Sequence, residues 1–351
     1  MMILVAIIGL SALIILHEVG HMLTAKAMGV KVTEFGVGFG PPLLKKRLGK
    51  TTYSLRIILL GGFVKMAGMN DDEEGPESYN SKAAWRRALI IFAGPFANLL
   101  VAVSIFATIF MVGVPTDVEP EVEEVVPGSL AADVGLERGD TILSVDGTPI
   151  EEWEDFQEVI GEKHPGDEVT IVAERNGDRE EYSGPLKADP DDSEKAIVGV
   201  QPVLVYTSYR PLDALWYGVE KTIQVLGLFG WFVGQLVTGE TSFYENATGP
   251  VGIVNVSSEI ASEGTLVFAQ LLAFISINLA VFNLLPILPL DGGHLFFIAA
   301  EKVLGRPVNP ETVARIAAFG LALILMLFVF ATYADLSKIF TGQPFIPEQG
   351  P

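Results

Sequence analysis

The residues His17-Glu18-Val19-Gly20-His21 stand near the end of an apolar run that begins at Met1. On a helix, His17 and His21 lie one above the other, so two imidazole nitrogens can reach one metal ion. This H-E-x-x-H spacing is typical of zinc sites in which both histidines bind Zn²⁺ and the glutamate, here Glu18, is the general base toward the activated water. The alternative is two core histidines and a surface glutamate. Ionisable groups inside an apolar span are costly and usually functional, which favours the metal site.

The length and composition predict a polytopic α-helical membrane protein that carries a soluble insert. The chain has 351 residues, half of them apolar, and its mean hydropathy is positive. A bilayer span needs about 20 apolar residues. We therefore expect the chain to cross the lipid bilayer about four times, with spans near residues 2–23, 88–114, 266–290 and 313–333.

Cysteine content and charge exclude several classes. The chain has no cysteine, so a zinc site must use histidine and carboxylate ligands. The formal charge of -20 argues against a nucleic-acid partner. Residues 115–200 hold 25 acidic and 6 basic residues, so most of the imbalance lies in one segment. Such a surface is usually a solvated face, and it would also suit a salty environment.

Two β-prone runs, residues 32–39 and 52–66, follow the first span. The first contains Gly36, Gly38 and Gly40, and neither run is long enough to cross a bilayer as a helix. Non-helical backbone is tolerated at membrane depth where protein buries it. We expect a membrane-associated β-hairpin beside the zinc motif, with an ordinary peripheral hairpin as the alternative.

Charge distribution and ligand geometry predict the topology. Residues 24–87 hold 11 of the 23 lysines and arginines, which places this connection in the cytoplasm and the N-terminus outside. We expect residues 212–237 to form an amphipathic helix on the outer surface. The third span then runs parallel to the first, and Asp291 reaches the depth of His17 and His21 as the third ligand. His294 is a competing ligand, for which a supporting role is the preferred interpretation. The expected parts are residues 1–114, 115–202, 203–265 and 266–351.

The segment 115–202 resembles bacterial PDZ domains, with the string from Pro127 to Asp140 as the most specific part. The resemblance implies an α+β domain that binds peptide C-termini along a sheet edge. The alternative is a PDZ fold that has no affinity for peptides and acts only through its size.

The zinc motif in the first span, the PDZ-like insert and Leu290-Asp291-Gly292 together resemble the site-2 protease family of intramembrane zinc metalloproteases. The resemblance covers essentially the whole chain. It implies that His17, His21 and Asp291 bind Zn²⁺, that Glu18 is catalytic, and that Asn283 holds the substrate backbone. It also implies that Gly36–Gly40 belongs to a re-entrant β-loop.

The same resemblance implies a substrate class and a location. The expected substrates are single-span membrane proteins, such as anti-sigma-factor-like proteins or remnant signal peptides, cut in regulated intramembrane proteolysis. The expected location is the inner (plasma) membrane. The distribution of basic residues and the directions of the spans put both termini and the PDZ domain on the outer, periplasmic side and the active site near the cytoplasmic face. Two alternatives stay open: a membrane zinc peptidase for soluble or lipidated peptides, and a PDZ-bearing scaffold without turnover.

Overall fold

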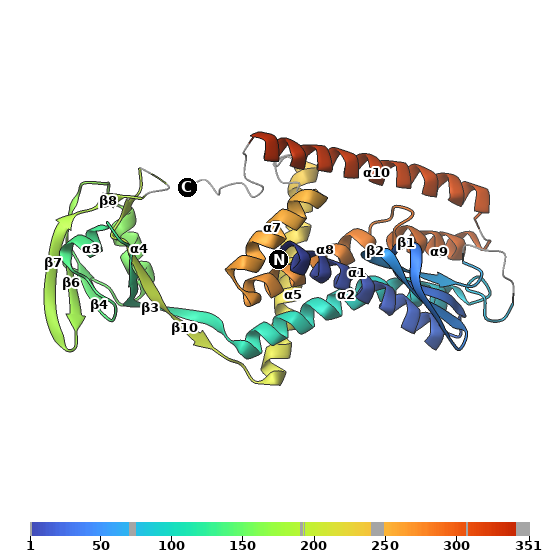
Figure 1. Cartoon of the computed structure of the whole chain (residues 1–351), viewed down its shortest axis with the longest axis horizontal. Helices are drawn as coiled ribbons and strands as arrows, with labels where there is room; N and C mark the ends of the chain where they lie inside the picture. The colour runs from blue at the N-terminus through green and yellow to red at the C-terminus, as the bar shows by residue number, and fades with distance from the viewer. Residues whose placement is uncertain are drawn as a thin grey trace. The chain divides into compact units, whose positions relative to one another are not determined.

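The computed structural model describes residues 2–69, 75–189, 192, 194–239, 249–306 and 308–341. The chain forms two compact units, one from Met1–Met111 with Arg210–Pro351 and one from Val112–Tyr209 (Figure 1). Residues 240–248, part of the predicted connecting segment 203–265, lie outside the described residues.

Among the described residues of the first unit, four helices are long and apolar enough to cross a membrane, as predicted. They are α1 (Met2–Ala27), α2 (Ala84–Val112), α8 (Thr265–Asn283) and α10 (Pro310–Thr341). The unit also contains α5 (Pro211–Thr238), α7 (Pro250–Glu263) and α9 (Asp291–Leu304). The predicted helix 212–237 corresponds to α5, and its place on the outer surface stays a prediction.

The third helix ends earlier than the sequence pattern indicated. We expected a span over 266–290, but α8 stops at Asn283 and a turn containing Pro286 and Pro289 follows. Proline lacks the backbone N–H that a helix needs and clashes with the preceding turn, so two prolines three residues apart favour a break in the helix here. The turn ends at Leu290, and Asp291 begins α9.

The N-terminus of α7 is held by a buried carboxylate of α10. Gly249 and Gly252 donate their backbone N–H groups to the two oxygens of Asp335 at 2.9 and 2.8 Å. Asp335 is fully buried. An anionic acceptor at a helix N-terminus satisfies free N–H groups and complements the helix dipole. This contact fixes α7 against α10.

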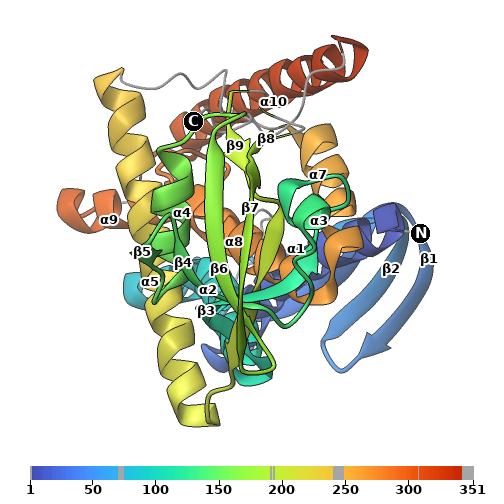
Figure 2. The ribbon, with the colours of Figure 1, turned by 90° about the vertical axis from the view of Figure 1, so that its left-hand side faces the viewer.

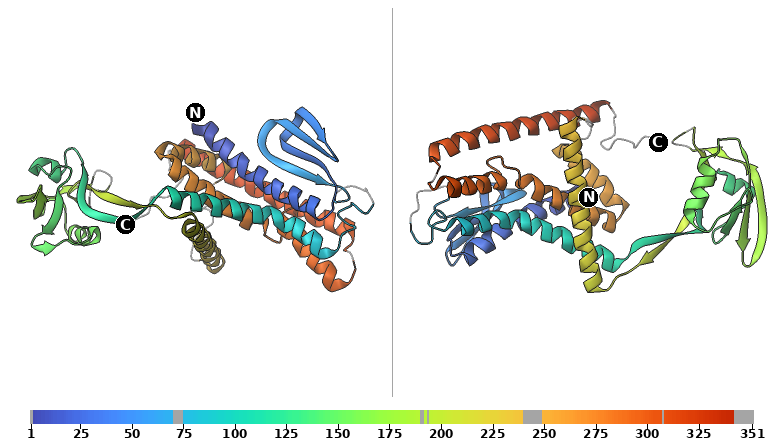
Figure 3. Two further views of the ribbon diagram at one scale, coloured as in Figure 1. Left: turned by 90° about the horizontal axis from the view of Figure 1, so that it is seen from below. Right: turned by 180° about the vertical axis from the view of Figure 1, so that it is seen from behind.

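The strands β1 (Val32–Leu48) and β2 (Thr51–Met66) form the expected antiparallel hairpin, which lies along α1 (Figure 3). The hairpin is folded on itself, because Phe35 pairs with both Val64 and Tyr53. The register gives four strand segments in the order 62–66, 32–37, 51–56 and 42–48. The first and last segments are therefore edges. The position of the hairpin in a membrane stays a prediction.

The second unit is an α+β domain around a six-stranded sheet, with a separate two-stranded sheet formed by β8 and β9 (Figure 2). The sheet order is β10-β3-β4-β6-β7, with β5 paired to β4. Asp146-Gly147 and Asn176-Gly177, dipeptides typical of tight hairpin turns, have positive φ at all four residues. The sheet and helices bury an apolar core that includes Val122, Leu130, Ile142, Val145, Trp153, Phe156, Val169 and Ile171. The strands and helices of this unit are β3 (Val114–Val125), α3 (Leu130–Val134), β4 (Thr141–Val145), β5 (Thr148–Pro149), α4 (Trp153–Gly161), β6 (Glu168–Arg175), β7 (Asp178–Pro185), β8 (Lys187–Ala188), β9 (Ala196–Ile197) and β10 (Val200–Thr207).

An ion pair supports this core. Arg175 donates to both oxygens of the fully buried Asp140 at 2.6 and 2.7 Å, and Glu137 N–H adds a bond of 2.8 Å. Burial alone would raise the pKa of Asp140, but these donors outweigh it and hold the pKa below its usual value. The carboxylate is therefore stabilised in its charged form.

We predict that Asp140→Asn destabilises the unit Val112–Tyr209 by about 2 to 3 kcal/mol at pH 7, because it removes charge-assisted hydrogen bonds to a buried group. The folded-state pKa is lowered, so this stabilisation is present above the unfolded pKa of about 3.9 and is lost as the pH falls through the lower folded value. Hydrogen exchange of peptides from the unit, in the whole chain, measures both effects. Asp133→Asn is the control, since its pairing with Lys187 is exposed and should contribute little. Equal protection in the two variants would contradict the prediction.

Candidate metal centre

Three predicted site residues meet in the first unit. His17 and His21 lie one turn apart on α1, and Asp291 is the first residue of α9. The Oδ2 atom of Asp291 is 3.1 Å from Nε2 of His17 and 3.3 Å from Nε2 of His21. The two Nε2 atoms are 3.1 Å apart. The proline-containing turn after α8 thus brings a carboxylate to the histidine pair.

The chemistry of this group fits a divalent cation. Both imidazoles are more than 90% buried, and Asp291 Oδ2 is buried without a hydrogen-bond partner. The facing nitrogen lone pairs and the carboxylate oxygen would repel one another without a positive charge between them. Two imidazole nitrogens and one carboxylate oxygen are the ligand set of catalytic zinc sites with one position left open. Among the described residues, these three side chains are the group that can hold a metal.

Helix α2 packs closely behind the two histidines. A Cβ at Gly94 would overlap Nε2 of His21 and lie 2.8 Å from Cε1 of His17. His21 contacts α2 again through Nδ1, which is 2.8 Å from the Ile90 carbonyl oxygen. Because Gly94 has no side chain, both imidazoles can lie against α2. A glycine in an apolar helix is typical of close helix packing, but the sequence alone does not indicate that it accommodates the histidines.

The edge segment 62–66 of the hairpin lies beside Glu18. The backbone N–H of Val64 bonds the Glu18 carboxylate, and a Cβ at Gly62 would lie 3.5 Å from Glu18 Cγ. Ser11, also on α1, donates to the Leu59 carbonyl at 2.9 Å and anchors β2 just before this segment. Gly62 was not among the predicted site residues. Its only signal was the glycine pair inside a β-prone run.

The glycines predicted from the resemblance occupy other parts of the hairpin. Gly36 lies in an inner segment, paired to Phe63 and Ser54, and the Phe63 ring fills the place of its missing side chain. Gly38 and Gly40 have φ near +85°, which permits the bend of β1. Their contact with a substrate stays a prediction.

Two further predicted residues lie near the metal ligands in the chain. Asn283 ends α8, and its side-chain amide donates to the Leu279 carbonyl at 2.9 Å. His294 lies three residues after Asp291 and is outside the group of three ligating atoms. The role of Asn283 toward substrate stays a prediction.

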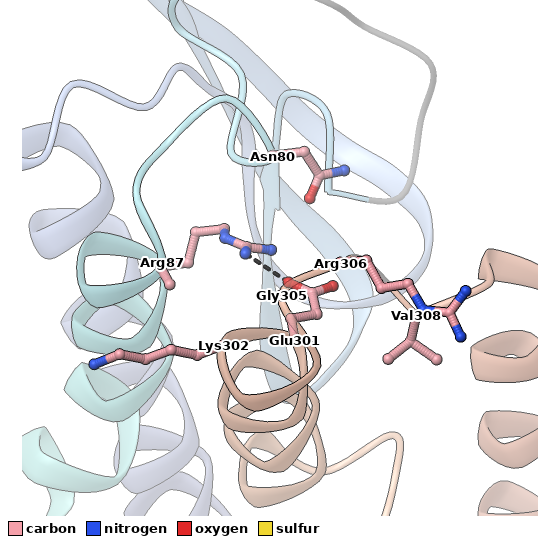
Figure 4. A pocket seen from close by; sticks show the side chains of 8 residues that line it. Asn80, Arg87, Glu301, Lys302, Gly305, Arg306 and Val308 are labelled. Carbon is pink, nitrogen blue, oxygen red and sulfur yellow. Dashed lines mark hydrogen bonds and ion pairs between the residues drawn. The ribbon is translucent and has the colours of Figure 1, made fainter.

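A separate cavity of about 530 Å³ lies where α2 begins and α9 ends. Its main polar contact is an ion pair of 2.6 Å between Arg87 and Glu301, which connects the two helices. Lys302 and Arg306 extend from this pair in opposite directions (Figure 4). Because the basic groups do not converge, we assign this cavity a structural role.

Four helices able to cross a membrane and a group of side chains able to hold a metal are together typical of a membrane metallopeptidase. The model of peptidase family M50 matches residues 5–327, and the chain belongs to this family. It is similar to proteins named as candidate zinc metalloproteases from Agrobacterium fabrum, at 34% identity over 95% of each chain, and from Clostridium acetobutylicum, at 31% identity over 95% of this chain and 97% of that one. It is also 28% identical to the zinc metalloprotease RasP of Bacillus licheniformis, over 93% of this chain and 97% of the relative. The chain is accordingly a zinc metalloprotease.

A quarter of the chain also aligns with a solved structure. This alignment covers 87% of a structure described as the PDZ domain of an SdrC-like protein from Listeria monocytogenes, at 30% identity and a TM-score of 0.22.

We predict that Gly94→Ala weakens zinc binding about tenfold or more, because the added methyl group displaces the ring of His21 from the centre. Helix α2 should persist, since alanine favours helix more than glycine does. Competition with a chromogenic chelator measures the affinity, and circular dichroism the helix content. Gly227→Ala is the matched control, because nothing lies within 4 Å of a Cβ at that position of α5. Wild-type zinc affinity in Gly94→Ala would show that contact with α2 does not hold the histidines.

Proposed function

We propose that this metalloprotease cleaves single-span membrane proteins, with Zn²⁺ held by His17, His21 and Asp291 and with Glu18 as the general base. The observation that carries the proposal is the place of the ligands. Two of them are on a helix that is long and apolar enough to span a bilayer. A peptidase centre built on such a helix is suited to peptide bonds that lie in or near the membrane.

The protein groups would divide the chemistry as follows. Bound zinc supplies a Lewis acid that polarises the scissile carbonyl and makes water more acidic. Glu18, adjacent in sequence to one ligand and three residues from the other, takes a proton from the attacking water and returns it to the leaving amine. The N–H of Val64 orients the Glu18 carboxylate toward this task. The apolar surroundings strengthen these interactions because they lower the local dielectric.

A transmembrane substrate must first unwind, because a helix shields its own peptide bonds. The edge segment 62–66 is supported on one side by the segment 32–37, and its position beside Glu18 supports a role as the strand that pairs with the unwound substrate. A side chain at position 62 would stand between this strand and Glu18. In this proposal Gly36–Gly40 shapes the hairpin, and the Asn283 amide binds one backbone group of the substrate.

The proposed substrates are anti-sigma-factor-like proteins or remnant signal peptides in the inner membrane. The proposed orientation places the unit Val112–Tyr209 and both termini outside, supported by the basic residues of 24–87. We further propose that this unit is a PDZ domain that binds peptide C-termini, supported by its sequence resemblance and its α+β sheet.

The orientation predicts the labelling of two engineered cysteines. Thr148→Cys and Thr238→Cys both replace exposed residues, and the native chain has no thiol. Both should react with a membrane-impermeant maleimide in intact cells, because the PDZ-like unit and the C-terminal end of α5 lie outside. Labelling at 148 with protection at 238 would mean that α5 crosses the membrane.

We predict that Glu18→Gln retains one zinc per chain and loses cleavage of a single-span substrate by at least 10²-fold, because the amide cannot take the proton. Zinc content by mass spectrometry and cleavage in proteoliposomes measure the two effects. Full activity would contradict the role of Glu18 as base, and loss of zinc would make it structural. In the native chain, cleavage of soluble or lipidated peptides alone would contradict the proposed substrate class.

A further inference from the structure

The two histidines of the centre use their ring nitrogens in the same way. Each directs Nε2 toward Asp291 and Nδ1 toward α2. A neutral imidazole that offers the lone pair of Nε2 to a metal carries its proton on Nδ1, which must then donate a hydrogen bond. For His21 the acceptor is the Ile90 carbonyl oxygen. His17 requires an acceptor of its own.

The group that faces Nδ1 of His17 is the side chain of Asn98. Asn98 is fully buried on α2, and its Nδ2 atom is 3.4 Å from Nδ1 of His17. The amide oxygen Oδ1 is buried without a hydrogen-bond partner. In this arrangement a donor faces a donor, and the only acceptor of the amide is unused. The separation of 3.4 Å is longer than an ordinary N–H···O bond, which fits two groups that both donate.

A rotation of the amide by 180° resolves both problems, because its nitrogen and oxygen are almost equal in shape. Oδ1 then accepts the Nδ1–H of His17, and the acceptor of the Asn98 amide is paired. Ile90, Gly94 and Asn98 are four residues apart on α2, so they follow one face of the helix. Along this face, the Ile90 carbonyl is an acceptor for His21, Gly94 leaves space for both rings, and the Asn98 amide oxygen is an acceptor for His17.

We infer that Asn98 is the positioning residue of the zinc site that fixes His17, through an Oδ1···H–Nδ1 bond that sets its tautomer and ring orientation. The inference rests on the proposed function, since it concerns the same metal centre. Helix packing alone does not explain the side chain. The contact of Asn98 with α8 uses its backbone carbonyl, which accepts from Ser276 at 2.8 Å, and this contact is open to any residue at position 98.

The test compares Asn98→Leu and Asn98→Asp in the full-length chain purified in detergent. Leucine keeps the approximate size but accepts no hydrogen bond, so zinc affinity should fall about 10 to 100-fold. Aspartate keeps the acceptor and removes the donor, so affinity should stay within about threefold of the native chain or exceed it. Chelator competition measures affinity, and the visible spectrum of the Co²⁺-loaded protein reports the ligand geometry. That spectrum should change in Asn98→Leu only.

Asn278→Leu is the matched control, because Asn278 also has an unpartnered amide oxygen, on α8, and should keep native affinity. Native affinity in Asn98→Leu would overturn the inference. So would weak binding in Asn98→Asp, which is decisive even if the leucine variant does not fold. If the native chain itself binds no zinc at His17, His21 and Asp291, the proposed function fails as well. Zinc binding that Asn98 does not influence would overturn only this inference.

Discussion

The close approach of two imidazoles and one carboxylate inside an apolar helical unit is the constraint on which the rest of this unit depends. Burying such groups is costly unless each polar atom has a partner. The Nε2 atoms and Asp291 Oδ2 converge within 3.3 Å, an arrangement that a bound cation stabilises. Close packing therefore has to bring three elements, α1, α2 and α9, to one point.

The sequence meets this constraint with residues that are small or that break helices. Gly94 lets α2 lie against both rings, and the prolines after Asn283 end α8 so that Asp291 can start a new helix. The ion pair between Arg87 and Glu301 then connects the far end of α9 to the beginning of α2. These features contribute more directly to placing the side chains of the metal site than to stabilising any individual helix.

Much of the site could be predicted from the sequence because its signals are local. The spacing of His17 and His21 gives their common face, and span lengths follow from apolar runs. The four candidate membrane helices were confirmed. The two β-prone runs do pair as a hairpin, and the association of this hairpin with a membrane stays a prediction. The meeting of Asp291 with the two histidines was predicted by comparing the depths of spans, although α8 ends earlier than expected and α9 was not foreseen. Its role as the third ligand stays a prediction. The prolines at 286 and 289 were the available signal for that break.

The remaining features depend on neighbours that are distant in sequence. The double pairing of Phe35 with Val64 and Tyr53 makes 62–66 an edge, and no local pattern encodes that arrangement. The place of Gly62 beside Glu18, and of Asn98 beside His17, likewise requires the folded chain. The roles of Gly62 and Asn98 therefore depend on side chains of another element, Glu18 and His17 of α1.

The identity of the third zinc ligand is the central claim, and the zinc content of Asp291→Ala and His294→Ala tests it most directly. Both purified variants would be compared with the native chain by mass spectrometry and chelator competition. We predict that Asp291→Ala loses tight zinc binding, while His294→Ala retains one zinc per chain. A metal-free His294→Ala beside a zinc-loaded Asp291→Ala would contradict the proposed centre.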